Sequence, residues 1–319
     1  MSRQSKPLNL ARLNDATLGA FGLVPSSETL DHLVRYLSTW SGSDKLFMII
    51  QYTLKLLIPL LHARAGLQHR YGYRKDPVSG AAVRWAKIGG IIGSARMLWR
   101  IWGLLPIFQW LISLERTPPP TRRLLTIERI QGWAMLGYYP LEHISYLRSN
   151  DLIPATIPSP VSYLSDTAKP IEINAGKLGM WSCRFWAFYV VLQFAHLRED
   201  RKLLQQRERT LKKGKMPAMA GELEDLSRRW DSYWNEMVVN MGNLPLTIHW
   251  SLEQGIIKND VWVGVFGLIG ALASFRSGWR ATALPKSAAP ALPSLIDDKS
   301  VDLGPIDPPA PLVGYDASS

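Results

Sequence analysis

Histidine is the residue type here best suited to metal or acid–base chemistry, but the spacing of the histidines supports neither role. The six are His32, His62, His69, His143, His196 and His249. His62 and His69 are seven residues apart, which on a straight helix separates the rings by two turns, too far to share one ion. We therefore predict no metal site.

The segment "HLRED" (196–200) contains a His/Asp pair whose spacing is one residue short of an acyltransferase motif. A histidine satisfied by its neighbours is the favoured interpretation of His196. The sequence also lacks the Gly-x-Ser-x-Gly, Gly-x-x-x-x-Gly-Lys-Ser/Thr, His-Glu-x-x-His and Gly-x-Gly-x-x-Gly patterns. We therefore predict that the chain is not an enzyme and has no catalytic residue and no cofactor.

The cysteine count and three arginines in apolar segments limit which sites and functions the chain can have. Cys183 is the only cysteine, so neither a disulfide within the chain nor a cysteine-based zinc site can form, and a reducing compartment is favoured.

Arg96, Arg100 and Arg184 lie in apolar segments, where a charged side chain is a functional candidate. An alternative function is therefore a channel for small anionic metabolites lined by these arginines.

The composition indicates a membrane rather than nucleic acid as the partner. Of 319 residues 47% are hydrophobic, 13 are tryptophan, and the net charge is +11. Tryptophan is enriched at membrane interfaces, and an anionic membrane surface attracts basic segments. Because the basic residues lie beside apolar helices, we expect anionic membrane lipids to be bound and no nucleic acid.

The periodicity predicts an all-α, membrane-associated protein with amphipathic N-terminal helices and one or two C-terminal spanning helices. The expected helices are 29–40, 43–64, 80–115, 124–148, 177–212, 221–241 and 245–279. We divide the chain into a partly disordered leader (1–28), an amphipathic membrane-remodelling region (29–150), a Pro-rich linker (151–176), a membrane-anchoring region (177–282) and a disordered acidic tail (283–319). The best candidate to span is 261–275, followed by 185–197.

The apolar segment 44–61 carries a polar stripe that argues against spanning. On a helix, Asp44, Lys45, Gln51, Tyr52 and Lys55 gather on one arc. Lys55 at a bilayer centre would cost about 2.5–3.5 kcal/mol. We therefore expect this helix to lie on the membrane or to pack against a neighbour.

The segment 83–105 has the same design with a basic, glycine-rich stripe. Gly89, Gly93, Arg96, Arg100 and Gly103 share one side of the helix. The opposite side carries Ile88, Ile91, Ala95, Leu98, Trp99 and Trp102. Such a helix is typical of one lying in the headgroup plane, yet close packing against a neighbouring helix explains the glycines equally well.

Two features could support self-association into a homo-oligomer. Trp230 and Trp234 lie on an apolar face of 221–241, and Gly264, Gly267 and Gly270 form a small-residue stripe in the last helix. Packing within one chain is the more common destination of such surfaces and is the favoured alternative.

Several motifs together resemble the peroxisomal membrane elongation factors, the peroxin-eleven family, over about residues 30–280. "DKLFMIIQY" (44–52), with Asp44, Lys45, Gln51 and Tyr52, resembles the start of that family. The Lys87-Ile88-Gly89 step resembles the core of its amphipathic helix, and 243–256 followed by 263–279 is similar to its closing pattern.

The resemblance implies a peroxisomal membrane protein that tubulates the membrane before peroxisome fission. It further implies self-association and contact with the peroxisomal fission machinery. The family's membrane-deforming helix falls on 81–105, which gives Arg84, Lys87, Arg96 and Arg100 a lipid-facing role. From the apolar side of this helix we expect Ile88, Ile91, Leu98, Trp99 and Trp102 to insert.

Overall fold

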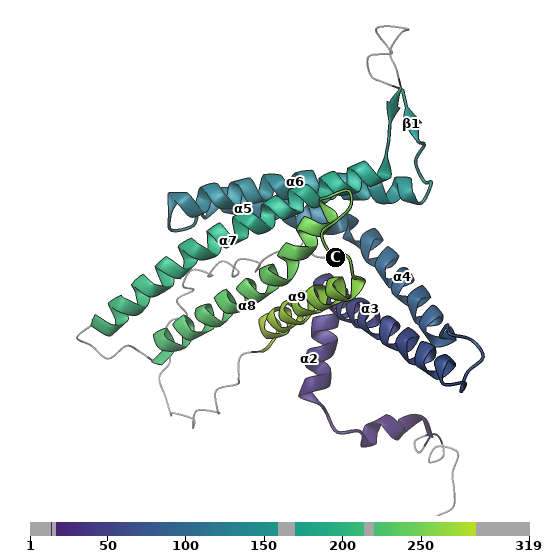
Figure 1. Cartoon of the computed structure of the whole chain (residues 1–319). Coiled ribbons are helices and arrows are strands. Elements are labelled where there is room, and N and C mark those ends of the chain that lie inside the picture. The colour runs from purple at the N-terminus through teal and green to yellow at the C-terminus, as the bar shows by residue number, and fades with distance from the viewer. Residues whose placement is uncertain (1–13, 15–16, 159–169, 214–219, 285–319) are drawn as a thin grey trace, which may run out of the picture.

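The structure, a computed structural model, describes residue 14 and residues 17–158, 170–213 and 220–284. Across these ranges the chain is almost wholly helical, which confirms the predicted all-α class (Figure 1). Most of the predicted leader, the middle of the predicted linker and nearly all of the predicted tail lie outside the described residues.

The elements follow one another as helices joined by short segments. In chain order they are η1 (Leu18–Leu23), α2 (Glu28–Leu37), α3 (Trp40–Arg70), α4 (Gly80–Trp99), η2 (Arg100–Gly103), α5 (Leu104–Arg116), α6 (Arg122–Ser149), β1 (Thr156–Ile157), β2 (Ile171–Glu172), α7 (Ala175–Lys213), α8 (Ala220–Trp250) and α9 (Asp260–Ala281). The two short strands pair antiparallel, with Thr156 opposite Glu172.

Two predicted helix boundaries were wrong. The predicted helix 80–115 is divided by the 3₁₀ turn η2. The predicted break near residue 242 is absent, because α8 continues through Pro245, and the chain instead leaves the helix after Trp250. Gly255 in the following segment has φ +61°, a backbone conformation that glycine adopts without steric cost.

Neighbouring helices run antiparallel through the fold. Helix α6 packs on α7, α7 on α8, α8 on α9, α9 on α3, and α3 on α4 (Figure 1). The largest core cluster joins these layers, with Met48 from α3, Met135 and Tyr138 from α6, Trp186 from α7 and Leu246 from α8 all nearly inaccessible. Helix α4 contacts α3 and α6 outside this cluster.

Three described segments are long and apolar enough to cross a membrane, judged by length and composition alone. They are Trp40–Arg70, Gly80–Arg116 and Asp260–Ala281. The last agrees with the expected span at 261–275, whereas 185–197 in α7 does not belong to this set. Helix α3 does as well, by length and composition alone, so the expectation that its polar stripe keeps it from spanning stays a prediction.

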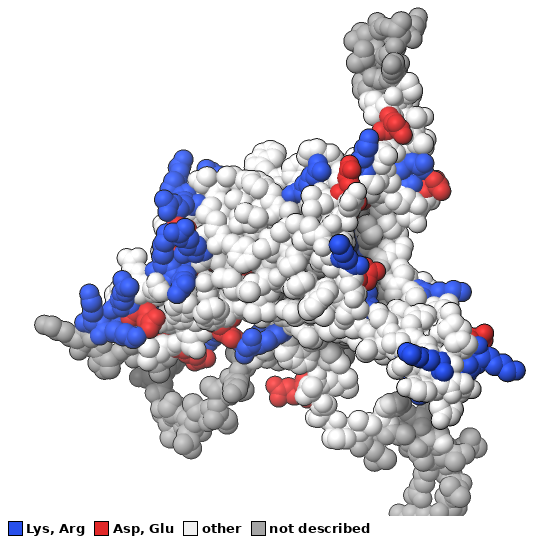
Figure 2. Space-filling model, in the orientation of Figure 1, with Lys and Arg blue, Asp and Glu red and all other residues white. Residues whose placement is uncertain are grey.

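Charged side chains are unevenly distributed on the face seen in Figure 2. Lys and Arg gather towards the far ends of α7 and α8 and around the turn that joins α3 to α4, while the centre is largely uncharged. An uncharged middle between charged ends is consistent with helices that contact lipid.

Candidate membrane-contact face of α4 and α5

Helix α4 begins at a serine cap and presents its glycines to α3. Ser79 Oγ accepts a hydrogen bond from the backbone N–H of Ala82 at 3.3 Å. A Cβ added at Gly93 would lie 2.8 Å from Gln51 Nε2, and one added at Gly89 would lie 3.8 Å from Leu54. The glycine-rich stripe therefore faces the protein and allows the two helices to approach closely.

Arg96 joins the polar stripe of α4 to that of α3. Its guanidinium donates from Nε to Asp44 Oδ1 at 2.8 Å, from Nη2 to Asp44 Oδ2 at 3.2 Å and from Nη1 to Gln51 Oε1 at 2.7 Å. Arg96 is only 3% exposed. Three charge-assisted hydrogen bonds satisfy a cation that would otherwise be costly to bury.

Arg100 makes the corresponding connection from η2 to α6. Its Nη1 donates to Glu142 Oε1 at 2.8 Å and to the Tyr138 hydroxyl at 2.9 Å. The Tyr138 hydroxyl in turn donates to Glu142 Oε1 at 2.6 Å. Arg100 is 2% exposed, so this network lies inside the protein.

These contacts correct the lipid-facing role that the resemblance implied for Arg96 and Arg100. Both arginines face the interior because acidic side chains from α3 and α6 hold them there. Arg84 and Lys87, nearer the start of α4, are exposed and remain available to lipid headgroups. The polar side of the helix is thus directed into the protein and its apolar side away from it.

The apolar side of α4 and η2 is exposed at the surface of the described chain. Its five predicted inserting residues are all exposed: Ile88, Ile91, Leu98, Trp99 and Trp102. Ile91 is 68% and Trp102 is 66% exposed. Contiguous exposed apolar side chains of this size mark a membrane or protein contact.

Helix α5, most of which lies beyond the predicted inserting helix at 81–105, also has an exposed apolar side. Leu105, Phe108 and Ile112 are exposed, whereas Ile107 and Leu114 on the other side are buried. Their spacing follows the helical period, and this signal was present in the sequence. We call the exposed apolar side chains of α4, η2 and α5 the apolar face.

The family-motif residues meet where α3 contacts α4 and α9. Asp44 and Gln51 bind Arg96, and Lys45 Nζ lies 4.0 Å from Asp44. Tyr52 is buried against Gly267 of α9. The motif therefore builds a helix junction.

The small-residue stripe proposed for self-association is occupied within the chain. Gly264 packs on Leu56, Gly267 on Tyr52, and Gly270 on Asn243. Trp230 packs edge-to-face on Tyr233 in a second, smaller core cluster. Trp234 differs, since it is 55% exposed, and it alone of these five candidates presents a large free surface.

The three arginines suggested for an anion channel are held apart by different partners. Arg184 donates from Nε to the Ser251 carbonyl at 3.1 Å and lies 4.5 Å above the ring of Trp181. Arg96 and Arg100 are neutralised by Asp44 and Glu142. All three arginines therefore have partners within the protein, and Arg100 Nε also donates to the carbonyl of Arg96 at 3.4 Å.

His196 lies between carboxylates from two helices. Its Nε2 lies 3.1 Å from Glu128 of α6, and its Nδ1 lies 3.0 Å from Asp200 of α7. Burial lowers the pKa of His196, but its hydrogen bonds to Asp200 and Glu128 outweigh that effect and raise the pKa to about 9. In the described ranges no group of three or more His, Cys, Asp or Glu side chains could hold a metal ion.

Comparison with known proteins gives three findings. The family model described as Peroxisomal biogenesis factor 11 (PEX11) matches residues 30–279. An uncharacterized protein of Schizosaccharomyces pombe is 24% identical over 203 residues, which cover 64% of this chain and 80% of that protein. No solved structure matches the chain.

Proposed function

The chain belongs to the peroxisomal biogenesis factor 11 family and is a peroxisomal membrane protein that takes part in peroxisome proliferation, and we propose that it elongates the membrane by inserting its apolar face. The observation that carries this proposal is the continuous exposure of Ile88, Ile91, Leu98, Trp99 and Trp102 on a helix whose polar side is fixed to the protein.

Burial of these side chains supplies most of the binding energy in this proposal. Each contributes roughly 1.5–3 kcal/mol when fully buried and less at an interface. Arg84 and Lys87 each add about 1 kcal/mol near an anionic surface. The apolar contribution is therefore larger, and added salt should weaken membrane binding without abolishing it.

The ion pairs of Arg96 and Arg100 hold the inserted helix against the rest of the protein. Arg96 and Arg100 attach α4 and η2 to α3 and α6, so the apolar face enters one leaflet together with the bundle behind it. Material added to one leaflet expands it relative to the other and favours curvature. No catalytic step is part of this proposal. The partners that we expect are further copies of the same chain, which would form a homo-oligomer, and the peroxisomal fission machinery.

The test places two charges on the apolar face of the full-length chain. Ile91→Glu with Leu98→Glu should prevent tubulation of anionic vesicles and leave few, enlarged peroxisomes in cells. The matched control is Gln206→Glu with Thr210→Glu, which adds the same charge at exposed positions of α7 and should tubulate normally. If the Ile91/Leu98 variant reaches peroxisomes and elongates them normally, the apolar face is not the remodelling element.

A further inference from the structure

Helices α6 and α7 run side by side in opposite directions and bind each other through polar groups (Figure 1). Gln131 Nε2 of α6 donates a hydrogen bond to Gln193 Oε1 of α7 at 2.6 Å. Towards the other end of the pair, Ser145 Oγ donates to the backbone carbonyl of Ala175 at 2.8 Å. These two bonds set the register in which α6 lies beside α7.

In this register, residues 130–147 of α6 lie beside residues 178–195 of α7, and every exposed side chain in both segments is apolar. These side chains are Ile130, Trp133, Pro140 and Ile144 on α6 and Trp181, Phe188, Val191 and Ala195 on α7. Each set falls within an arc of about 80° on its helix, so each helix has one apolar side. We call these side chains the α6–α7 face.

Two charged side chains, Glu142 and Arg184, lie in these segments, and both have partners within the protein. Glu142 is buried beside Arg100. Arg184 lies on the same side of α7 as the exposed residues, but it donates to the backbone carbonyl of Ser251 and stacks 4.5 Å above the ring of Trp181. Since Arg184 is within two helical turns of the end of its segment, its side chain can extend towards the headgroup level.

Basic side chains begin at both ends of the two segments. At one end Arg148 of α6 and Lys177 of α7 adjoin them directly. At the other end Arg123 of α6 lies 3.1 Å from Glu199 of α7, and Arg198 is exposed. A helix the length of either segment rises about 27 Å, which is close to the hydrocarbon thickness of a bilayer, about 30 Å. The apolar length of both helices therefore matches a membrane.

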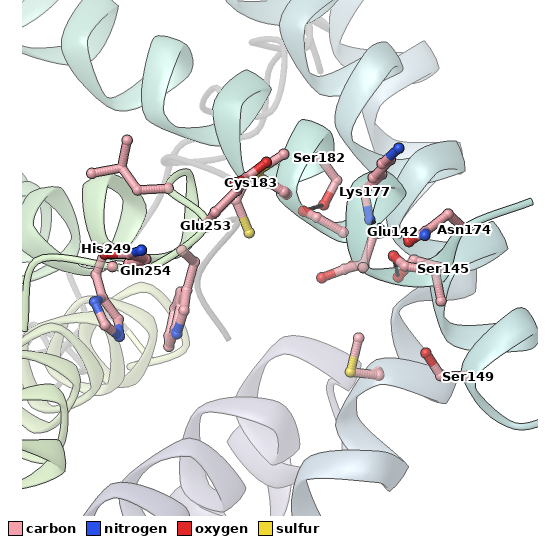
Figure 3. A pocket seen from close by; sticks show the side chains of 18 residues that line it. Glu142, Ser145, Ser149, Asn174, Lys177, Ser182, Cys183, His249, Glu253 and Gln254 are labelled. Carbon is pink, nitrogen blue, oxygen red and sulfur yellow. Dashed lines mark hydrogen bonds between the residues drawn. The ribbon is translucent and has the colours of Figure 1, made fainter.

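The surroundings of Lys177 are polar as well. A cleft lies at this end of the pair, and its lining includes residues of α6, α7 and the segment that follows α8. Figure 3 shows Ser145, Ser149, Asn174 and Lys177 among its lining side chains. Polar side chains grouped at this level are expected beside lipid headgroups and water, because hydrocarbon cannot form hydrogen bonds with them.

We propose that α6 and α7 cross the bilayer as an antiparallel pair whose α6–α7 face contacts lipid hydrocarbon. Of these two helices, the sequence indicated a span only in α7, at 185–197. The strands β1 and β2, which lie between the two helices in the chain, are then on one side of the membrane and the end of α7 on the other.

A second copy of the chain could cover the α6–α7 face instead. Lipid is favoured because the apolar segments of the two helices are equally long and charged side chains begin at matching levels on both. This inference goes beyond the proposed function, which concerns α4 and α5. Its tests measure labelling, so loss of tubulation would leave their results unchanged.

The test of the crossing uses single cysteines in the full-length chain. Cys183 is the only cysteine, so Cys183→Ser gives a cysteine-free background. Ser149→Cys and Thr210→Cys then each place one thiol at an exposed position, beyond opposite ends of the pair. In intact peroxisomes, a membrane-impermeant maleimide should label one of these two proteins and should label the other only after the membrane is permeabilised.

The test of the lipid contact compares these positions with the α6–α7 face. Ile144→Cys and Val191→Cys each place a thiol on that face. The thiolate is the form that reacts, and apolar surroundings disfavour it, so both should react about tenfold or more slowly than the two end positions in permeabilised membranes. As a control, all four proteins should react at the same rate once they are unfolded in detergent.

The two tests can fail separately. Labelling of Ser149→Cys and Thr210→Cys from the same side of the membrane overturns the crossing. Labelling of Ile144→Cys and Val191→Cys as fast as the end positions overturns the lipid contact. Slow labelling combined with efficient oxidative crosslinking of Val191→Cys to a second copy also overturns the lipid contact, because the chain itself then covers this face.

Discussion

Arg84 and Arg96 lie on one helix, yet their surroundings assign them opposite roles. Arg96 is buried and bonded to Asp44 and Gln51, whereas Arg84 is exposed. Breaking a buried ion pair costs about 3–5 kcal/mol, because the remaining charge stays buried without its partner. An exposed cation contributes about 0–1 kcal/mol.

We therefore expect Arg96→Ala to destabilise the fold strongly and Arg84→Ala to leave its stability nearly unchanged. Thermal unfolding of the detergent-solubilised protein measures both effects on stability. Arg84→Ala should instead weaken binding to anionic vesicles, because it removes an exposed cation. Equal unfolding temperatures for the two variants would contradict the buried role of Arg96.

His196 makes the packing of α6 on α7 dependent on pH. Because its pKa rises from 6.5 to about 9 on folding, the charged ring stabilises the folded state. That stabilisation is fully present below the unfolded value of 6.5 and is lost as the pH rises through about 9. Wild-type protein should therefore lose unfolding temperature between these two pH values relative to His196→Gln. Parallel pH profiles for the two proteins would exclude the effect.

At the scale of elements, the sequence predicted which side chains share one face of a helix, but it did not predict what each face contacts. Periodicity correctly separated the polar and apolar sides of 83–105, but it carries no information on which side meets lipid. The partner of Arg96 is an acidic residue on the preceding antiparallel helix, Asp44. Opposite charges on the polar stripes of consecutive helices were visible in the sequence and could have indicated the pairing.

Two other features of the fold could not be predicted from the hydrophobic periodicity of the sequence. Whether the chain leaves the helix at Pro245 or after Trp250 depends on packing of α8 against α9 and on the conformation of Gly255. A cleft beside Glu142 combines residues from α4, α6, α7, α8 and the segment that follows α8. Spatial combinations of this kind arise from the tertiary fold, and no local pattern encodes them.

The contact of α9 with α3 gives a prediction that belongs to this scale. A Cβ at Gly267 would collide with the ring of Tyr52, whereas one at Gly90 would meet nothing within 4 Å. Gly267→Ala should therefore cost about 1–3 kcal/mol through overpacking. Gly90→Ala, in the exposed part of α4, should be neutral or stabilise by about 0.4–1 kcal/mol. Thermal unfolding of both variants measures the difference, and equal effects would contradict this helix contact.

At the scale of the whole molecule, the exposed apolar surface exceeds what α4 and α5 contribute. Trp234, Val238 and Met241 are exposed along α8, at spacings that place them on one helical side. Charged side chains concentrate beyond this middle zone (Figure 2). Lipid or a second copy of the chain could cover such a surface. Replacing one large exposed side chain with alanine should weaken self-association only in the second case.

We predict that self-association of the protein uses Trp234 and does not use Trp230. A central tryptophan in an interface contributes about 2 kcal/mol or more, so Trp234→Ala should weaken association by about tenfold or more. Both tryptophans pack edge-to-face on Tyr233, but Trp234 is 55% exposed, so Trp230→Ala, in the smaller core cluster, should lower the unfolding temperature more. Trp262→Ala is the control, since Trp262 is equally exposed on α9 and should crosslink like the wild type. Crosslinking of Trp234→Ala in vesicles at wild-type efficiency would show that lipid, rather than a second copy, covers this side of α8.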